Sequence, residues 1–260
     1  MKHPINQPLI KENVNVALNQ KSPLTGESKI SEANLGGLHI ALFVLFAFLF
    51  TPAYSQLCAQ YPSVIEIITK KDTKLSASSL QHFCKENKLD PASLFVWNNH
   101  WVLYSRFNNI DKLKAKLKAT YPAVSLKLYR KPFYVFNRKR CDNGNIAKEW
   151  TNSVLTANLV KDTAMQKQYM EYHRTQFEKW PEVGRGFCNA NFQQLLVFRT
   201  GRQLMLIISI PKGEDLDKLN PKTSENNPRV DEWNKTMSKY QEGLEDAPKG
   251  DTWEFLKQVQ

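Results

Sequence analysis

Residues 192–210, FQQLLVFRTGRQLMLIISI, hold two apolar runs separated by Thr200 and Gly201. Apolar runs of this length around a glycine-containing turn are typical of two paired β-strands, because glycine adopts the positive φ that tight turns require. We therefore predict an antiparallel hairpin. Around it the pattern predicts a strand at SVLTANLV (153–160), a helix opening at Asp162, a helix from about Pro228 to Leu244 and a strand at WEFLKQV (253–259).

The first half of the chain has the same order of predicted strands and helices. VIEIIT (64–69) is a β-branched run, and LFVW and WVLYSRF are apolar runs separated by Asn98, Asn99 and His100. Asparagine tolerates positive φ, so this spacing predicts a second hairpin. Helical patterns cover residues 76–87 and 109–119, and VSLKLY (124–129) alternates as a strand does.

Two consecutive βαββαβ orders predict an α+β protein built from two tandem ferredoxin-like units. We place these units at residues 56–137 and 151–260, with a polar linker at 138–150. Each unit leaves one apolar sheet face in need of cover. We therefore expect the two sheets to pack face to face as a pseudo-dimeric α/β barrel within one chain, and a homodimer is the alternative.

The net charge of +11 is carried almost entirely by residues 56–150. Its densest part is a run of lysines in a predicted helix, where alternation with leucine and alanine favours a solvated helix face. We expect no nucleic-acid partner. An anionic partner of another kind, bound by this basic first unit, is compatible with the charge.

Residues 1–55 form a predicted targeting segment. Ile40–Phe50, IALFVLFAFLF, is too short for a membrane span of roughly 20 residues but suits the core of a signal peptide. Ala53 and Ser55 then form a cleavage site that would leave Gln56 first. We expect export, with a membrane anchor through residues 38–50 as the alternative.

The cysteines, Cys58, Cys84, Cys141 and Cys188, lack the spacing of a metal site, and in an exported chain they can form disulfides. Their spacing does not select a pairing. Nucleotide-binding, zinc-protease and serine-hydrolase motifs are not found in the sequence.

Tyr169 and His173 are four residues apart in a predicted helix, so their side chains share one face and can reach the same small ligand. A histidine near its usual pKa can donate or accept a proton near neutrality. The same spacing also suits the buried face of an ordinary helix. Trp233 likewise falls in an apolar stripe, and Trp180 with Pro181 is typical of a helix end.

Three blocks of the second unit, taken together, carry a family resemblance. They are YMEYHRTQFEKWPEV (169–183), QLLVFRTGRQLMLIISI (194–210) and NPRVDEWNKTMSKYQ (227–241). In this order they resemble the L-rhamnose mutarotases. The resemblance implies a mutarotase that uses no cofactor and no metal and interconverts the anomers of L-rhamnose or a similar deoxyhexose.

By the same resemblance His173 is the proton donor and Tyr169 binds the sugar. Trp233, Asn234, Trp180 and Gln194, with Leu195 beside the last, are the implied substrate contacts. Three residues are inserted after His173 relative to the shortest family members. The first unit lacks the Tyr-x-x-x-His pair, so we expect a degenerate, non-catalytic copy. Two other functions stay open: a sugar-binding or interaction module without turnover, and a haem-binding or oxygenase-type protein with His173 as an axial ligand.

Overall fold

The hairpin predicted from residues 192–210 is present in the computed structural model as β7 (Gln194–Thr200) and β8 (Gln203–Pro211), with Gly201 at a φ of +61° in the turn. The structure describes residues 61–70 and 75–260. The predicted targeting segment and Cys58 lie outside the described residues. No helix within the described ranges has the length and apolar character needed to cross a membrane.

The first half has the element order that the sequence predicts. Ser76 and Asn109 cap its two long helices by accepting hydrogen bonds from backbone N–H groups of the first turn. Asn98 has a φ of +49° in the hairpin turn. The elements are β1 (Ser63–Ile68), α1 (Ala77–Glu86), η3 (Pro91–Ser93), β2 (Leu94–Trp97), β3 (His100–Ser105), α2 (Ile110–Thr120) and β4 (Ser125–Tyr129).

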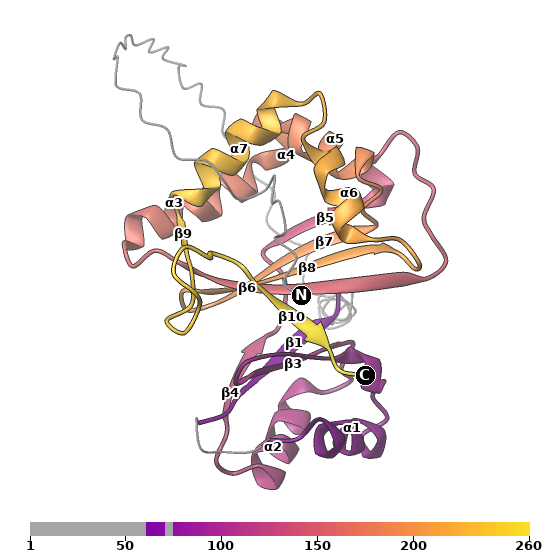
Figure 1. Ribbon diagram of the computed structural model, residues 1–260, viewed down its shortest axis with the longest axis vertical. Helices are drawn as coiled ribbons and strands as arrows, with labels where there is room; N and C mark the ends of the chain where they lie inside the picture. Colours follow the sequence, from indigo (N-terminus) through magenta and orange to yellow (C-terminus); the bar gives the residue numbers. More distant parts are fainter. Residues whose placement is uncertain (1–60, 71–74) are drawn as a thin grey trace, which may run out of the picture. The chain divides into compact units, whose positions relative to one another are not determined.

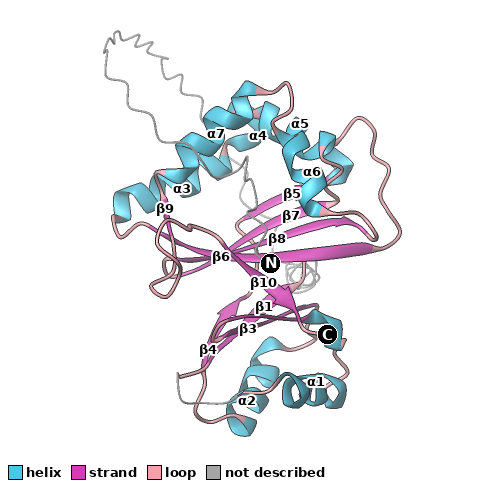
Figure 2. Ribbon diagram, viewed as in Figure 1, coloured by secondary structure: helices cyan, strands magenta, loops and turns pink. Residues whose placement is uncertain are grey.

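The second half repeats this order with a more divided helical layer, because the helix capped by Asp162 ends at Arg174 and two further helices follow. Its helices lie on one face of the strands (Figures 1 and 2). Besides β7 and β8, the elements are β5 (Tyr134–Asn137), η4 (Arg138–Arg140), β6 (Trp150–Leu159), α3 (Thr163–Arg174), α4 (Gln176–Lys179), α5 (Pro181–Asn189), α6 (Leu216–Leu219), η5 (Asn220–Thr223), α7 (Pro228–Ser238), β9 (Gln241–Glu242) and β10 (Glu254–Gln258).

The predicted extension of the last helix to Leu244 is wrong, because α7 ends at Ser238. The Tyr240 N–H donates to the Met237 carbonyl in a tight turn, and residues 241–242 then pair with β6 as β9. The edge of β6 offers backbone partners to this segment, and the apolar spacing of the sequence does not reveal them.

The strand order confirms an α+β fold with an antiparallel sheet. The first half has the order β4-β1-β3-β2 and the second half the order β10-β6-β8-β7, and β2 pairs with β10 to join them. Residues 134–137, which the sequence reading places in the first unit, instead form β5 and pair with β7. Tyr134 and Phe136 of this short strand point into the core of the second half. The division into tandem domains stays a prediction.

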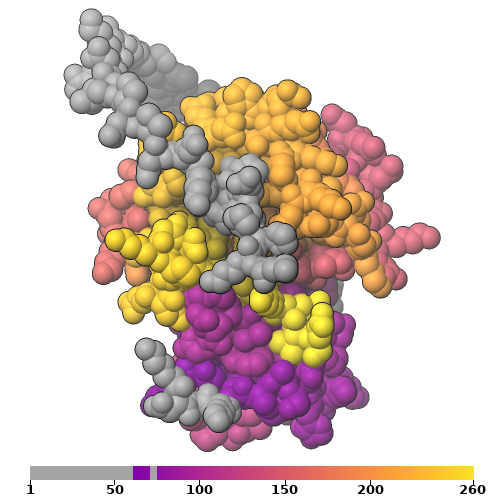
Figure 3. Space-filling model, in the orientation of Figure 1, coloured from indigo at the N-terminus to yellow at the C-terminus, as the bar shows by residue number. Residues whose placement is uncertain are grey.

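The sheet strands of the two halves share a buried apolar cluster. Its members come from β1 to β4 in the first half and from β6, β7, β8 and β10 in the second. The space-filling view shows the yellow C-terminal residues against the purple surface of the first half, where β10 pairs with β2 (Figure 3). The cluster consists of Val64, Phe95, Val102, Tyr104, Tyr129, Val154, Leu196, Phe198, Met205, Ile207 and Leu256.

One end of this shared layer is polar and is organised by Glu66 of β1, which is fully buried. Its carboxylate accepts hydrogen bonds from His100 Nδ1 at 2.6 Å, Tyr129 Oη at 2.8 Å and Gln203 Nε2 at 2.8 Å. Burial alone would raise the pKa of the Glu66 carboxyl, but the hydrogen bond from His100 and the charge of Lys127 outweigh burial and lower the pKa. Because Gln203 belongs to β8, this charged group links the two halves.

A disulfide joins Cys141, just after β5, to Cys188 in α5. It settles a pairing that the sequence left open. Cys84 in α1 is a buried free thiol. In the chain-entropy model, closing a segment with a sequence separation of 47 residues stabilises the fold by about 4 kcal/mol.

We predict that Glu66→Gln lowers the free energy of unfolding by about 3 kcal/mol, because the amide leaves buried donors with poor partners. Chemical denaturation monitored by fluorescence measures this change. Glu245→Gln is the matched control, since Glu245 is exposed and its substitution should change stability by less than about 0.5 kcal/mol. Equal effects of the two substitutions would contradict the role of Glu66.

Candidate active site

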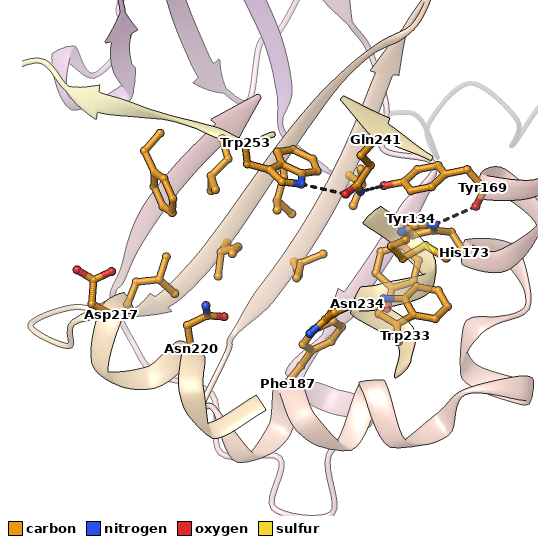
Figure 4. Close-up of a pocket in the computed structure, with 18 residues that line it drawn as sticks. Tyr134, Tyr169, His173, Phe187, Asp217, Asn220, Trp233, Asn234, Gln241 and Trp253 are labelled. Atoms are coloured by element: carbon orange, nitrogen blue, oxygen red, sulfur yellow. Dashed lines mark hydrogen bonds between the residues drawn. The ribbon is translucent and has the colours of Figure 1, made fainter. Parts of the chain in front are cut away.

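A cavity of about 120 Å³ lies between the helices of the second half and its sheet (Figure 4). The strands give it an apolar floor, and the helices and loops add most of the polar groups. The floor consists of Leu155, Leu195, Val197, Leu206, Ile208 and Phe255. The residues with polar groups are Tyr134, Tyr169, His173, Asp217, Asn220, Trp233, Asn234, Gln241 and Trp253. The volume is well below the roughly 300 Å³ at which pockets for drug-sized ligands begin, so the cavity suits one small ligand.

His173 lies on the buried face of α3 and is 8% exposed. Its Nδ1 is 3.0 Å from the backbone carbonyl oxygen of Tyr169. A carbonyl can only accept, so Nδ1 carries the ring proton and Nε2 keeps a free lone pair. Burial lowers the pKa of His173 to about 4, against a smaller opposing effect of this hydrogen bond. The imidazole is therefore neutral near pH 7 and accepts protons through Nε2.

Tyr169 lies one helical turn before His173, and the centroids of the two rings are 4.3 Å apart. Gln241 Nε2 donates to the Tyr169 hydroxyl at 3.1 Å. Burial raises the pKa of the Tyr169 phenol far above its usual value, so the hydroxyl keeps its proton at physiological pH. The cavity wall thus has an imidazole that accepts a proton next to a phenol that can donate one (Figure 4).

Aromatic rings surround the imidazole and account for much of its burial. The ring centroids of Phe133, Tyr134 and Trp233 lie 5.6, 5.2 and 5.3 Å from that of His173. The Tyr134 hydroxyl donates to Gln176 Oε1 at 2.6 Å. Neither Phe133 nor Tyr134 was predicted, because the strand that positions them, β5, was not recognised in the sequence.

The structure places four of the six candidate residues around the cavity: His173, Tyr169, Trp233 and Asn234. Trp180 lies behind Trp233, with ring centroids 5.6 Å apart, and is not among the lining residues. Gln194 also does not line the cavity. Side chains alternate along β7, so Leu195 and Val197 face the cavity whereas Gln194 points to the opposite face.

Several polar lining residues were missed by the sequence reading: Asp217, Asn220, Gln241 and Trp253. Asn220 is notable because its Oδ1 is buried and has no hydrogen-bond partner among the described residues. A buried acceptor without a partner costs free energy, which a ligand hydroxyl would recover. Asp217 and Asn220 come from the short helices α6 and η5, Gln241 comes from the two-residue strand β9, and Trp253 lies just before β10. Sequence spacing does not show that these elements meet at one cavity.

No three His, Cys, Asp or Glu side chains in the described part of the chain lie close enough together to hold a metal ion. The polar groups of the cavity are instead amides, indoles, phenols, one imidazole and the carboxylate of Asp217. They are suited to hydrogen bonds with a ligand that carries several hydroxyl groups.

The fold and this cavity define an α+β protein whose cavity has the size for one small polar ligand and has an imidazole and a phenol on its wall. A family model described as L-rhamnose mutarotase matches residues 154–260. The L-fucose mutarotase of Xanthomonas campestris is 31% identical over 97 residues, which are 37% of this chain and 75% of that protein. A UPF0734 protein of Dictyostelium discoideum is 26% identical over 98 residues, or 38% of this chain and 76% of that protein. The chain belongs to the L-rhamnose mutarotase family.

We predict that His173 makes folding sensitive to acid. Its pKa is lowered in the folded state, so the unfolded chain binds a proton first as the pH falls below about 6.5, and stability is lost between that pH and about 4. Between about pH 7.5 and about pH 5 the loss should be about 2 kcal/mol. Denaturant unfolding at both pH values measures it.

The variant His173→Gln should lack this component of the acid sensitivity. His82→Gln is the control, because His82 is exposed on α1. A pH dependence that is the same in His173→Gln and the wild type would show that His173 is not a buried neutral imidazole.

Proposed function

We propose that this protein is a mutarotase that interconverts the anomers of a 6-deoxyhexose such as L-rhamnose or L-fucose. The observation that carries the proposal is the pairing of Tyr169 and His173 in complementary proton states on one wall of a small cavity. Family membership supports it, since the family model and the Xanthomonas relative are both described as mutarotases of such sugars.

Mutarotation needs one proton removed and one supplied. His173 Nε2 accepts the proton of the anomeric hydroxyl while the bond between the anomeric carbon and the ring oxygen breaks. The Tyr169 hydroxyl donates its proton to that ring oxygen, and an open-chain aldehyde results. After rotation of the aldehyde, the opposite proton transfers close the ring with the other configuration. Both side chains return to their starting state, so no co-reactant is consumed.

The pKa of each group favours concerted transfer. A buried imidazole with a pKa of about 4 is a weak base, and a buried phenol is a weak acid. A full proton transfer to His173 alone, or from Tyr169 alone, would leave an unpaired charge in a largely apolar cavity, which is costly. When both protons move together, the imidazolium and the phenolate that form are a neighbouring pair with no net charge. General acid–base catalysis of this kind typically contributes about 10² to 10⁴ in rate.

The cavity also favours a deoxy sugar. L-Rhamnose and L-fucose carry a methyl group where ordinary hexoses carry a hydroxymethyl group, and the apolar floor offers that methyl group a suitable surface. Asn220 and Asp217 lie at the end of the cavity away from His173 (Figure 4). We propose that they accept hydrogen bonds from the hydroxyls farthest from the anomeric carbon.

Two other functions make different predictions. A sugar-binding module would bind the same sugars without accelerating anomer exchange. A haem-binding protein would need space for a porphyrin beside His173, and a porphyrin is larger than a cavity of about 120 Å³. The cavity therefore favours the sugar over haem.

Export remains part of this proposal. The disulfide between Cys141 and Cys188 supports it, because disulfides form and persist in oxidising compartments. Under this proposal the chain acts on free sugar outside the cytoplasm, and the basic first half contacts an anionic partner there.

We predict that the purified protein accelerates anomer exchange of L-rhamnose or L-fucose, measured by saturation-difference NMR. His173→Ala and Tyr169→Phe should each lower the rate by about 10² or more, because each removes one proton-transfer group. His82→Ala on the exposed face of α1 is the control and should keep the wild-type rate.

Saturation transfer from protein to sugar, measured on the same samples, separates the rival functions. Binding without faster exchange in the wild type would favour the sugar-binding module. Neither binding nor exchange across a panel of deoxy and ordinary hexoses would overturn the proposal.

A further inference from the structure

We propose that Gln241 and Trp253 are positioning residues that fix the direction of the Tyr169 hydroxyl proton. This inference rests on the proposed mutarotase function and adds two residues to it. Neither is expected to transfer a proton. Together they would make the phenol a donor toward the cavity, which is the role that ring opening requires.

The donor and acceptor types of three side chains fix this direction. Trp253 Nε1 lies 3.2 Å from Gln241 Oε1, and Gln241 Nε2 lies 3.1 Å from the Tyr169 hydroxyl (Figure 4). An indole nitrogen only donates, so the amide oxygen must face Trp253 and the amide nitrogen must face the phenol. A flipped amide would set two N–H groups against each other.

The same argument then applies to Tyr169. The amide nitrogen of Gln241 has no acceptor capacity, so the phenol oxygen accepts from it and the phenol proton cannot point toward Gln241. The proton is left to point elsewhere, and Tyr169 is among the residues that line the cavity. We infer that the proton is directed to a ligand there. The position of the His173 ring proton is fixed as well. Its Nδ1 donates to the Tyr169 carbonyl, so Nε2 is left as an acceptor.

The backbone around Gln241 holds this chain of hydrogen bonds in place. β9 pairs with β6, with Gln241 opposite Leu159. Arg202 donates at 2.6 Å to the Leu159 carbonyl and at 2.5 Å to Glu242 Oε1, which ties β9 to the neighbouring hairpin. The early end of α7 is therefore necessary for this role, because a helix continuing to Leu244 would remove Gln241 from β9.

Gly243 brings the two positioning residues together. A Cβ atom at this position would lie 2.3 Å from the Asp251 carbonyl oxygen, so a residue with a side chain could not occupy it without a backbone shift. This close approach draws the segment that ends at Trp253 against β9. The arrangement of Gln241 and Trp253 is thus built into the chain path.

The decisive variant is Gln241→Glu, which reverses the hydrogen bond. The carboxylate can only accept, so the Tyr169 hydroxyl would donate to it and no longer to the sugar. We expect kcat for anomer exchange to fall about 100-fold with a much smaller change in KM. Gln241→Leu removes the bond without reversing it, and it should lower kcat only about tenfold.

The pH profile separates this role from a merely structural one. In Gln241→Glu, kcat should rise as the pH falls from about 7.5 to about 5.5, because a protonated carboxyl can again donate to the phenol. The wild type and Gln241→Leu should show no such rise. Gln260→Glu is the matched control, since it makes the same amide-to-carboxylate change at an exposed residue after β10 and should keep the wild-type kcat.

A measurement without turnover keeps the inference testable if the protein proves inactive. The ¹³Cζ resonance of Tyr169, assigned with Tyr169→Phe, should move downfield in Gln241→Glu relative to Gln241→Leu, because donation to a carboxylate gives the phenol more phenolate character. Identical resonances would overturn the inference whether or not the wild type acts on sugar. An active wild type with equal kcat in both Gln241 variants would overturn it as well, whereas an inactive wild type with the shifted resonance would overturn only the proposed function.

Discussion

The hydrogen bond from His173 Nδ1 to the Tyr169 carbonyl is the contact on which the candidate site depends. The acceptor comes from the helix itself, because the carbonyl four residues earlier lies on the same face of α3. This bond satisfies one ring nitrogen and leaves the other free. It also lets the imidazole be buried as a neutral group, which avoids the several kcal/mol that an unpaired buried cation would cost. A neutral base in an apolar cavity needs a nearby acid, and Tyr169 is already held there by the same helix.

The two halves use the same strand order for different purposes. In the first half the space between sheet and helices is filled by apolar side chains, among them Leu80, Phe83 and Leu117, and its core has no counterpart of Tyr169 and His173 within the described residues. In the second half that space holds the cavity. The first half instead covers the other face of the second sheet through the shared apolar cluster and the hydrogen bonds of Glu66. A carboxylate that three strands must satisfy at once is compatible with only one register between them.

The sequence predicted the regular parts of this structure well. The two βαββαβ orders follow from apolar runs, capping residues and turn residues such as Asn98 and Gly201, which act locally. β5 and β9 were missed because they are short and form only where a strand edge far away in sequence offers partners. The residues of the candidate site divide in the same way, into those that local spacing reveals and those that tertiary contacts place. Tyr169 and His173 could be found from their helical spacing, whereas Tyr134, Asn220, Gln241 and Trp253 reach the cavity through tertiary contacts. Gln194 was misplaced because a shift of one position along a strand reverses the face.

The disulfide lies in the half that contains the cavity and joins the segment after β5 to a helix of the cavity wall. At the cavity the helices and the sheet lack the direct packing contacts that hold them together elsewhere, and fewer packing contacts mean lower stability. The disulfide of Cys141 and Cys188 contributes about 4 kcal/mol in the chain-entropy model, which acts in the opposite direction. The disulfide also lies near the cavity, because α5 carries both Cys188 and the cavity-lining residue Phe187. In the first half Cys84 is a free thiol within an apolar core that packs the helices on the sheet. The covalent link therefore supports the helical layer in the half that contains the cavity.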